Sequence, residues 1–565
     1  MSRSVDKLLF LQLPCIDSDT AGARENVYLA AHYLRWTLER RRGGHPFDVV
    51  IPPPETDLLD DSNIIEYILG VKPDVICATL YLWNIERTLG ILERIKAGRK
   101  GLMIAVGGPE VAPDHPFLFT SGIPDVAVTG EGEPVIAPVL EGLRVGRRPV
   151  LPATAWKTQR GYKWGPPGPL GANLTDILPP PWNECNRPFD DGVGYLETGR
   201  GCPLRCTFCC YNQRRRTASY LAVDDVVRRV SVLCARGARE IRFVDPTFNS
   251  NPDFELIVTA LAMLNRRKTL KFFAEVRAET ITARQAELLS AANFTDIEVG
   301  VQSRDKAVLR LIRRPTALKR LDHGVGLLAA RGIRLTVDVM CGLPGQGMSD
   351  MLDSVRWAAS IPKARVQFLH TLLLPGTELR DRRSALGLTS QELPPYRVVS
   401  TRRLSAEDIA GAEAASASIT GTTADNPTMR FVGSKLPDLF GDRMEVDLTA
   451  SDIEVSGRSS RRALVFRGED LYALRDRICL IIECAIKAER HILWQFVLAP
   501  GSEEPLDLLD EMIATIDSVP PTYLDRWVVD GRRASRRVLI LLNPDRQYSR
   551  SWINAAEDLL AEAFH

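Results

Sequence analysis

The sequence has almost no net charge, no apolar run long enough to cross a membrane and no evident internal repeat. Its 72 Lys and Arg residues balance 71 Asp and Glu residues, which leaves a formal charge of +1 over 565 residues. This balance gives no overall field to attract nucleic acid or anionic lipid. Apolar runs such as 538–542 are far shorter than the roughly 20 residues that span a bilayer. We therefore expect a soluble protein with neither nucleic acid nor membrane as a partner.

The chain also lacks the features of a secreted protein. Residues 1–7 carry no charged and apolar pattern typical of a secretory signal, and the 11 cysteines are scattered over the whole length. This distribution argues against a disulfide scaffold and for a reducing compartment. We expect a cytoplasmic protein.

Length and composition indicate a multidomain globular protein. Hydrophobic residues make up 45% and charged residues 25%, which is ordinary, and 565 residues predict about three or four domains. The pattern of apolar runs divides the chain into residues 1–145, 146–190, 191–380 and 381–565.

Residues 1–145 predict a doubly wound, Rossmann-like parallel sheet, because short apolar runs alternate with amphipathic helical patterns. The expected strands are 8–13, 47–51, 74–80, 102–106 and 126–128, and the expected helices are 24–41, 63–69, 85–97 and 134–143. Ligands of such sheets bind beyond the carboxyl ends of the strands, where the winding direction reverses. A flat tetrapyrrole or a nucleotide would fit the crevice between 14–22, 81–87 and 107–109.

The other segments differ in pattern. Residues 146–190 are rich in Pro, Gly and Trp, and we expect a linker without regular structure. Residues 191–380 alternate about six strands with helices, which predicts a partial β/α barrel with its chemistry at the carboxyl ends of the strands. For residues 381–565 we expect an α+β domain that shapes or closes a substrate cavity.

Cys202, Cys206 and Cys209 are spaced C-x3-C-x2-C in a loop after the first barrel strand. Three thiols at this spacing can bind three corners of a cubane 4Fe–4S cluster and leave the fourth iron open. Structural zinc would need a fourth ligand, and the adjacent candidate, Cys210, should point away from Cys209. The reducing compartment disfavours a disulfide, and ordinary buried cysteines are not packed so densely in a loop. We favour the cluster.

The cysteine loop, with Phe208 just before its last cysteine, resembles the signature of radical S-adenosylmethionine enzymes. The resemblance implies that the open iron binds S-adenosylmethionine and that reductive cleavage gives a 5′-deoxyadenosyl radical. It also implies an electron donor of the flavodoxin or ferredoxin type. The similarity extends over about residues 195–379.

Later strand ends resemble further motifs of that family. The resemblance implies that Phe208, Asp245, Glu275, Arg277 and Gln302 bind S-adenosylmethionine. Other roles stay open, because Glu275 and Arg277 would also suit a salt bridge at the barrel rim, and Gln302 would suit a core amide.

A doubly wound domain ahead of such a barrel resembles the cobalamin-dependent radical S-adenosylmethionine enzymes, which are mostly methyltransferases. The resemblance implies a cobalamin site built from strand-end residues: Thr79, Leu80, Trp83, Asn84, Gly107, Gly108, Pro109, Gly130 and Glu131. Taken alone, 107–109 would also suit a plain strand-to-helix turn.

One expected cobalt ligand is missing. Many cobalamin proteins carry D-x-H-x-x-G after the first strand, but residues 17–22 place Asp19 where the histidine would stand. His115 follows a different strand, and we favour a histidine in a surface loop over a cobalt ligand at this position. We predict that no histidine binds cobalt from below and that Trp83 covers the lower corrin face by packing. The alternative for Trp83 is a core aromatic residue.

The resemblance implies a methylation that consumes two molecules of S-adenosylmethionine. One methylates cobalamin, and the other gives the radical that removes hydrogen from the substrate before the methyl group of methylcobalamin is transferred. We favour an sp3 carbon of a small natural-product (antibiotic-type) biosynthetic intermediate, free or carrier-bound. Tyr211 could line the substrate cavity or serve only in packing.

Other functions stay open at this point. The same cofactors could support oxidation, ring contraction or cyclisation without methyl transfer, or the chain could be a non-catalytic cobalamin or cluster sensor. An RNA-modifying role is less favoured, because the sequence has neither a dense basic run nor an evident RNA-binding appendage.

Overall fold

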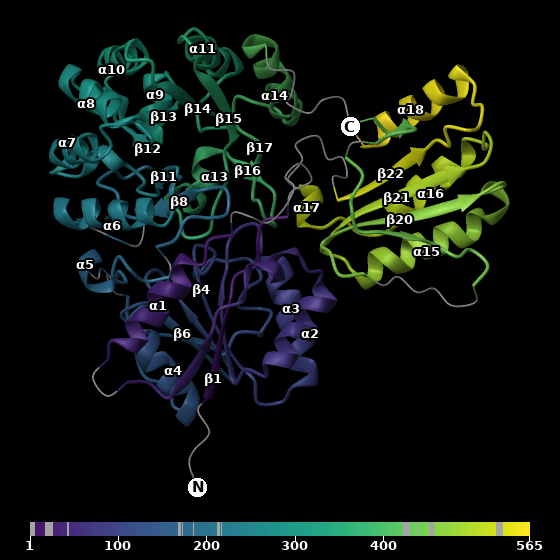
Figure 1. The fold of residues 1–565 in the computed structure, drawn as a ribbon, viewed down its shortest axis with the longest axis horizontal. Coiled ribbons are helices and arrows are strands. Elements are labelled where there is room, and N and C mark those ends of the chain that lie inside the picture. Colours follow the sequence, from purple (N-terminus) through teal and green to yellow (C-terminus); the bar gives the residue numbers. More distant parts are fainter. Residues whose placement is uncertain are drawn as a thin grey trace.

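The computed structural model covers residues 1–565. It describes all of them except 1–5, 17–25, 42–43, 168–170, 172, 185, 212–214, 216, 422–429, 437, 451–456, 527–534 and 565. Three sheets, two of them all-parallel and the first mostly parallel, define three lobes, and the first sheet lies below the barrel in Figure 1 with the C-terminal lobe beside both. No helix in the described ranges is long and apolar enough to cross a bilayer.

The first lobe contains a seven-stranded sheet with the order β2-β1-β3-β4-β5-β6-β7. The first five strands pair in parallel: β1 (Asp6–Leu11), β2 (Phe47–Val50), β3 (Val75–Thr79), β4 (Met103–Gly107) and β5 (Val126–Val128). The winding direction reverses between β1 and β3, because β2 lies on one side of β1 and the later strands lie on the other. A ligand crevice is therefore expected beyond the carboxyl ends of these two strands.

Helices cover both faces of this sheet, as the doubly wound prediction requires. They are α1 (Leu29–Glu39), α2 (Asp61–Val71), α3 (Ile85–Gly98) and α4 (Ile136–Val145), with the 3-10 turn η1 (Pro54–Leu58) before α2. Leu9 and Leu11 of β1 pack in the core that includes residues of α2 and α3, whereas Leu8 and Phe10 pack in the core shared with α1 and α4. The alternation follows from the two-residue period of a strand.

The structure corrects the prediction that residues 146–190 lack regular structure. Strands β6 (Thr154–Thr158) and β7 (Gly161–Trp164) form an antiparallel hairpin that extends the first sheet at β5, and α5 (Leu174–Ile177) follows. Trp156 is buried opposite Val126. The hairpin covers a strand edge that would otherwise present unpaired backbone groups. The described residues between β7 and residue 190 contain no strand.

The central lobe is a six-stranded, all-parallel sheet with the order β15-β14-β13-β12-β11-β8, which confirms the partial barrel. Its strands are β8 (Val193–Leu196), β11 (Glu240–Phe243), β12 (Lys271–Val276), β13 (Phe294–Gln302), β14 (Arg334–Cys341) and β15 (Arg365–His370). Its helices are α6 (Val223–Ala235), α7 (Phe254–Leu264), α8 (Ala283–Ala292), α9 (Lys306–Leu311), α10 (Leu318–Ala330) and α11 (Met348–Ala359), with turns η2 (Phe248–Ser250) and η3 (Ala278–Thr280). Between β8 and α6, β9 (Gly199–Arg200) and β10 (Ser219–Tyr220) pair antiparallel and bracket the cysteine loop.

A short segment links the barrel to the last lobe. It contains α12 (Glu378–Asp381), α13 (Arg383–Leu386), the pair β16 (Thr389–Ser390) and β17 (Val398–Ser400), and α14 (Ala406–Thr420). Cys341, Met351 and Ile409 share one core, so this segment packs on the end of the barrel.

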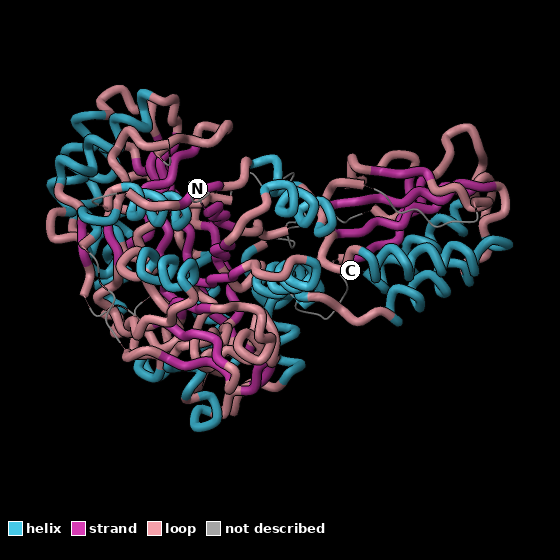
Figure 2. Tube along the Cα trace, turned by 90° about the horizontal axis from the view of Figure 1, so that it is seen from below, coloured by secondary structure: helices cyan, strands magenta, loops and turns pink. Residues whose placement is uncertain are grey.

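The C-terminal lobe corrects the expected α+β arrangement. Its strands are β18 (Val432–Gly433), β19 (Arg443–Glu445), β20 (Arg461–Gly468), β21 (Leu493–Pro500) and β22 (Arg536–Leu541), and every pair is parallel. Between and after them lie η4 (Tyr472–Leu474), α15 (Arg475–Ala488), α16 (Asp507–Ser518), α17 (Tyr523–Arg526) and α18 (Arg550–Phe564). Figure 2 shows the long helices of this lobe on one face of its sheet. The lobe is α/β, because its strands are joined by helical crossovers.

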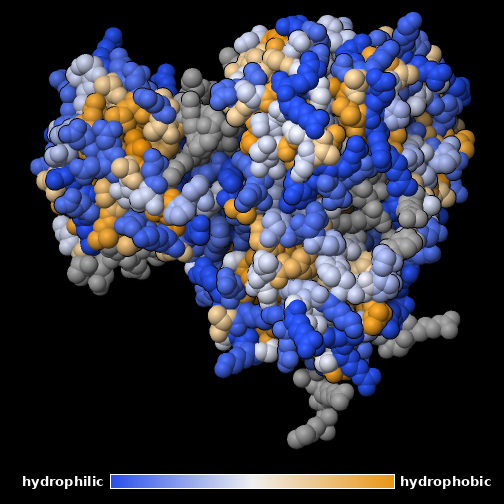
Figure 3. Space-filling model, turned by 180° about the vertical axis from the view of Figure 1, so that it is seen from behind, coloured by the Kyte–Doolittle hydropathy of each residue, from blue (hydrophilic) through white to orange (hydrophobic). Residues whose placement is uncertain are grey.

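This lobe projects from the side of the molecule, as the space-filling view shows (Figure 3), and docks on the first lobe through buried charges. Arg462 pairs with Asp60, both almost fully buried, and His491 Nδ1 lies 3.1 Å from Asp61 Oδ2. Asp61 also accepts a 2.7 Å bond from Arg87, which is completely buried in α3. The C-terminal lobe is therefore anchored to the start of α2 and α3.

Candidate active site

A cavity of about 1260 Å³ opens between the carboxyl edge of the first sheet and the barrel. Among the predicted residues, Thr79, Trp83, Gly107, Gly108, Pro109, Gly130 and Glu131 of the first lobe line it, and so does Tyr211 of the second. The residues predicted to bind S-adenosylmethionine are not among its described lining: Phe208, Asp245, Glu275, Arg277 and Gln302. Leu80 and Asn84, also predicted for cobalamin, are fully buried and do not line it. The described lining ends at Leu374, so no described residue of the C-terminal lobe forms part of its wall.

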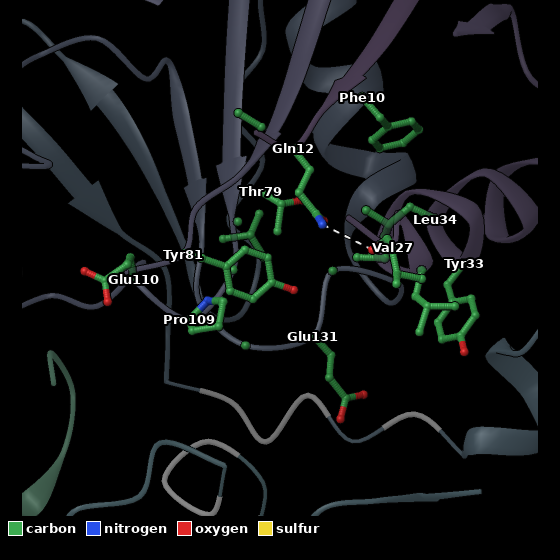
Figure 4. Close-up of a pocket in the computed structure, with 18 of the residues that line it drawn as sticks. Phe10, Gln12, Val27, Tyr33, Leu34, Thr79, Tyr81, Pro109, Glu110 and Glu131 are labelled. Atoms are coloured by element: carbon green, nitrogen blue, oxygen red, sulfur yellow. Dashed lines mark hydrogen bonds between the residues drawn. The ribbon is translucent and has the colours of Figure 1, made fainter. Parts of the chain in front are cut away.

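The turn after β3 presents two aromatic rings to this cavity. Tyr81 and Trp83 stack with their ring centroids 4.5 Å apart and their planes 7° apart. Burial raises the pKa of the Tyr81 phenol. Figure 4 shows Tyr81, Thr79 and Gln12 around the cavity below the strand ends. The pair forms a flat apolar surface of the kind that packs against a macrocycle.

Asn84 holds this turn in place from behind. Its side-chain oxygen accepts from Tyr81 N at 2.8 Å, and its Nδ2 donates to Leu13 O at 2.9 Å and to Thr79 O at 3.2 Å. One buried amide therefore ties the ends of β1 and β3 to the turn. Asn84 is a positioning residue rather than a lining one.

Gly108 is required by a close backbone approach. Its φ is +107°, and a Cβ there would lie 2.5 Å from the carbonyl oxygen of Leu80. Leu80 N in turn donates to Gly107 O at 2.8 Å. The backbone of 107–109 can thus contact the backbone of the β3 turn directly, because no side chain at Gly108 separates them.

Ion pairs close the wall between the two lobes. Arg200 donates to Glu133 Oε1 at 2.8 Å and to both oxygens of Glu197 at 2.7 and 2.8 Å, and Arg215 pairs with Glu131. Burial alone would lower the pKa of Arg200, but Glu197 and Glu133 raise it above its ordinary value. Glu131, predicted to bind cobalamin, is thus engaged with the barrel lobe, toward which it extends in Figure 4. The site is a closed interface rather than two separate clefts.

The cysteine loop fits a cubane cluster. Burial raises the pKa of Cys209 to about 12, and the thiols of Cys210, Cys206 and Cys202 add to this rise, so the thiols lie near one another. In the described chain no three His, Cys, Asp or Glu side chains converge on a single ion, as zinc would require. A cubane needs no such convergence, because each thiolate binds a different iron.

Neighbouring groups support the cysteine sulfurs. Arg314 Nη1 donates to Cys206 Sγ at 3.7 Å, and Thr247 Oγ1 lies 3.7 Å from Cys202 Sγ. Such contacts to cluster sulfurs tune an iron–sulfur centre. Phe208 packs between two small cores at the end of the barrel rather than in the large cavity.

Carboxyl groups line the barrel interior at the ends of successive strands. Asp245 is 2% exposed and accepts from Thr198 N at 2.7 Å, and burial raises its pKa to about 7. Burial and the neighbours Glu298 and Asp245 raise the pKa of Glu275 to about 7. Such groups can accept hydrogen bonds or hold a proton near neutral pH.

The two remaining predicted residues differ in surroundings. Arg277 pairs with Glu279 and donates to Pro315 O at 2.8 Å, which matches the alternative of an ion pair at the rim. Gln302 has a left-handed backbone with φ +67°, and its buried Oε1 has no partner within the described chain. An unsatisfied buried acceptor at a strand end suits a bound ligand.

Sequence reasoning missed several of these groups. Burial, with the charges of Glu298 and Glu275, raises the pKa of Asp338 to about 8, and Arg200, Glu197 and Glu133 form the lobe interface. Arg200 stands just before the cysteine loop and could have been noticed for that reason. Its partner Glu133 lies 67 residues earlier, so no local pattern reveals the pair.

His115 is buried and engaged, so the surface-loop expectation is wrong. Its Nδ1 accepts from Leu118 N at 3.0 Å, which places the ring proton on Nε2, 3.1 Å from Glu110 Oε2. Tyr396 also donates to Glu110 Oε2, at 2.9 Å. No histidine is among the described residues that line the cavity. The segment 17–22 with Asp19 lies outside the described residues.

Comparisons with known proteins agree with this architecture. A family described as "Radical SAM superfamily" matches residues 196–358, and one described as "B12 binding domain" matches residues 40–140. The chain is 25% identical over 347 residues to "Uncharacterized methyltransferase PH0819" of Pyrococcus horikoshii, which covers 59% of this chain and 74% of that protein. It is 26% identical over 308 residues to the cobalamin-dependent radical SAM methyltransferase TokK of Streptomyces tokunonensis, covering 50% of this chain and 44% of TokK. The chain thus spans less than half of TokK.

Two solved structures share the fold. TsrM of Kitasatospora setae, a radical S-adenosylmethionine methyltransferase with cobalamin and a 4Fe–4S cluster bound, aligns with a TM-score of 0.55 at 18% identity, covering 69% of this chain and 78% of TsrM. The cobalamin-dependent radical enzyme OxsB, with aqua-cobalamin and S-adenosylmethionine bound, aligns with a TM-score of 0.57 at 16% identity, covering 73% and 66%. Residues 196–358 are therefore a radical S-adenosylmethionine domain and residues 40–140 a B12-binding domain, and the chain shares its fold with two enzymes whose structures hold cobalamin.

Proposed function

We propose that this chain is a cobalamin-dependent radical S-adenosylmethionine methyltransferase, with cobalamin, S-adenosylmethionine and a 4Fe–4S cluster as its cofactors. It transfers a methyl group to an sp3 carbon of a small natural-product intermediate, free or carrier-bound. The observation that carries the proposal is the single cavity, which has strand ends of the first lobe on one side and Cys210 and Tyr211, next to the cluster cysteines, on the other. Proximity favours this arrangement, because a primary radical must meet its target before it is quenched. A carrier-bound substrate has support from a relative named 2-(S-pantetheinyl)-carbapenam-3-carboxylate methyltransferase.

The residues have distinct tasks in this proposal. When bound, methylcobalamin supplies the methyl group, and S-adenosylmethionine at the cluster supplies the hydrogen-abstracting radical. Cys202, Cys206 and Cys209 hold the cluster, and Glu275 and Gln302 offer acceptors to S-adenosylmethionine. The Arg200 ion pairs exclude water by keeping the lobes together.

In the first lobe, Thr79, Gly107, Gly108, Pro109 and Gly130 approach cobalamin with backbone and small side chains. We propose that Trp83, backed by Tyr81, covers the lower corrin face. An absorption spectrum of the purified holo-protein should then lack the signature of histidine-ligated cobalt, and a histidine-ligated spectrum would refute this assignment.

Domain roles follow from the same geometry. We propose residues 1–145 together with the β6–β7 hairpin as the cobalamin domain and 191–380 as the radical domain. Residues 381–565 brace the cavity from outside, which is supported by the contacts of His491 with Asp61 at the start of α2 and of Arg526 with Glu86 at the start of α3. A cytoplasmic location suits the reduced thiols and a low-potential cluster.

Methyl transfer is tested with S-adenosylmethionine that carries a deuterated methyl group. The reconstituted enzyme and candidate substrates, free or loaded on a carrier, are incubated with reductant, and the product is analysed by mass spectrometry. Transfer adds three deuterium atoms for each methyl group. A product that is oxidised, contracted or cyclised without label would instead support the alternative radical reactions. A Cys206→Ala variant should lose 5′-deoxyadenosine formation and the label together.

A further inference from the structure

We propose that an arginine-rich surface over the cysteine loop is the docking site for a small acidic protein that carries one electron. This surface, the arginine face, consists of Arg205, Arg310, Arg313, Arg382 and Arg383. The inference rests on the proposed function, because it takes the cluster to be held by Cys202, Cys206 and Cys209.

The arginine face lies next to the cluster cysteines because two segments clasp their loop. Thr207 N donates to Ile312 O at 3.0 Å, and Thr207 O accepts from Leu379 N at 2.9 Å. The first contact brings the end of α9 against the loop, and the second brings α12. Arg205 directly precedes Cys206, so its Cα lies about 3.8 Å from that of the cysteine.

The same side chains are turned to solvent. Arg313 is 56% and Arg382 41% exposed, and Arg205, Arg310 and Arg383 are also exposed. Leu311, 36% exposed, adds an apolar contact among them, and Pro203 is exposed on the loop itself. Exposed arginine beside an apolar side chain is typical of protein interfaces.

The charge of the arginine face departs from that of the chain. Two carboxylates lie in the same segments: Glu378, which bonds Arg313 at 2.6 Å and Arg382 at 3.0 Å, and the exposed Asp381. Five arginines against two carboxylates leave an excess of three positive charges, whereas the whole chain carries only +1. Such a local excess attracts an acidic partner and raises the rate of encounter.

The arginine face is separate from the described cavity. The arginines that line the cavity are Arg200 and Arg215, and no member of the arginine face is among the lining residues. The cysteine loop therefore has two sides, with Cys210 and Tyr211 toward the cavity and Arg205 toward solvent. The proposed function places the substrate on the cavity side of the loop, so the solvent side is open to a reductant.

The electron transfer balances simply. The reduced carrier loses one electron and the oxidised cluster gains one for each cleavage of S-adenosylmethionine. Because electron tunnelling weakens steeply with distance, the donor must sit close to the cluster. The arginine face meets this requirement and adds the charge that an acidic carrier needs.

The test compares two electron sources on one holo-protein. The variant Arg310→Glu with Arg383→Glu reverses two charges that form no ion pair with a carboxylate within the described part of the chain, since Arg383 donates to the carbonyl oxygen of Arg380. The matched control is Arg266→Glu with Arg267→Glu, two exposed arginines after α7 that precede the amino-terminal end of β12. The initial rate of 5′-deoxyadenosine formation is measured with reduced flavodoxin and, separately, with dithionite.

We expect the Arg310 and Arg383 variant to lose about tenfold in the flavodoxin-driven rate at low salt, since steering changes rates by roughly 10- to 1,000-fold. Its dithionite-driven rate and iron content should stay within twofold of the wild type, and salt should narrow the flavodoxin difference. An unchanged flavodoxin-driven rate, or an equal loss in the control, would overturn the docking proposal. Wild-type protein that forms no 5′-deoxyadenosine with dithionite would overturn the proposed function itself, and the docking proposal with it.

Discussion

Replacing Arg200 by Met should open the interface between the first two lobes. The change removes a guanidinium that donates three bonds of 2.7 to 2.8 Å, two to Glu197 and one to Glu133. The side chains of Arg200, Glu197 and Glu133 are only 17%, 14% and 7% exposed. Methionine fills a volume similar to that of arginine, so the loss of stability would come mainly from the missing charge and its hydrogen bonds.

The burial of these side chains determines how much stability the Arg200→Met change removes. Removing one partner of a buried ion pair costs about 3–5 kcal/mol, because the other charge is left desolvated. Exposed pairs contribute only about 0–1 kcal/mol. Arg242 offers a matched control, since it makes a 2.7 Å bond to Glu240 but is 42% exposed. Arg200→Met should therefore cost at least 2 kcal/mol more than Arg242→Met, by roughly this difference.

The assay is urea unfolding of the full chain followed by tryptophan fluorescence. Several transitions are expected for a multidomain protein, so the midpoint of the first one is compared between variants. Arg200→Lys keeps the charge but loses the two-pronged bond to Glu197, and its cost should lie between those of Arg200→Met and the wild type. Equal midpoints for Arg200→Met and Arg242→Met would refute the reasoning, because burial would then not decide the strength of the pair.

Three further predictions concern other buried groups. Asp60 pairs with Arg462 and also caps α2, because its side chain accepts from Asn63 N at 2.8 Å. Asp60→Ala should lower the free energy of unfolding by about 1 kcal/mol more than Asp60→Asn, since asparagine keeps a capping side chain. Equal unfolding midpoints for the two variants would contradict this. Asn84→Ala should lower the free energy of unfolding by about 1–3 kcal/mol, because three hydrogen bonds at the β3 turn are lost. The variant should also lose bound cobalamin faster during gel filtration. Unchanged cobalamin retention would count against the positioning role of Asn84. Burial raises the pKa of Asp245 from 3.8 to about 7, so the folded state binds the extra proton and stability should fall between about pH 4 and pH 7, by up to about 1.4 kcal/mol per pH unit. Glu275 and Asp338 contribute to the slope in the same direction, so Asp245→Asn should reduce the slope of unfolding free energy with pH without abolishing it, and an unchanged slope would contradict the role of Asp245.

The fold was largely predictable because most strands and helices have strong periodic patterns. The buried run of β3 and the alternating cores of β1 carry signals that depend only on neighbours in sequence. The β6–β7 hairpin was missed because prolines and glycines around it suggested a loop, while its stability comes from pairing with β5. The parallel pairing of the C-terminal sheet is likewise a long-range property, and composition does not reveal strand direction.

The candidate site was predictable where one short motif carries the chemistry. Cys202, Cys206 and Cys209 lie within eight residues of one loop, and Trp83 follows a clear strand. Residues that act through distant partners were not accessible, and Glu133 with Arg200 is the clearest case. Asn84 was predicted to contact a ligand because it follows a strand end. In the structure its side-chain amide instead donates to the backbone carbonyls of Leu13 and Thr79.

The interface between the lobes and the cluster loop form one mechanical unit. Arg200 ends β9, and only Gly201 separates it from Cys202. Gly201 has a φ of +92°, and a Cβ there would lie 3.0 Å from Arg215 Cδ, so this junction is tightly packed. We expect a movement that parts Glu133 from Arg200 to shift Cys202 as well. We therefore predict that ligand binding in the first lobe and events at the cysteine loop are coupled through β9, and such coupling is reciprocal by thermodynamic necessity. A variant that loosens the Arg200 pairs should weaken cobalamin retention and alter the cluster spectrum together, whereas a change in only one of them would show that the two sites act independently.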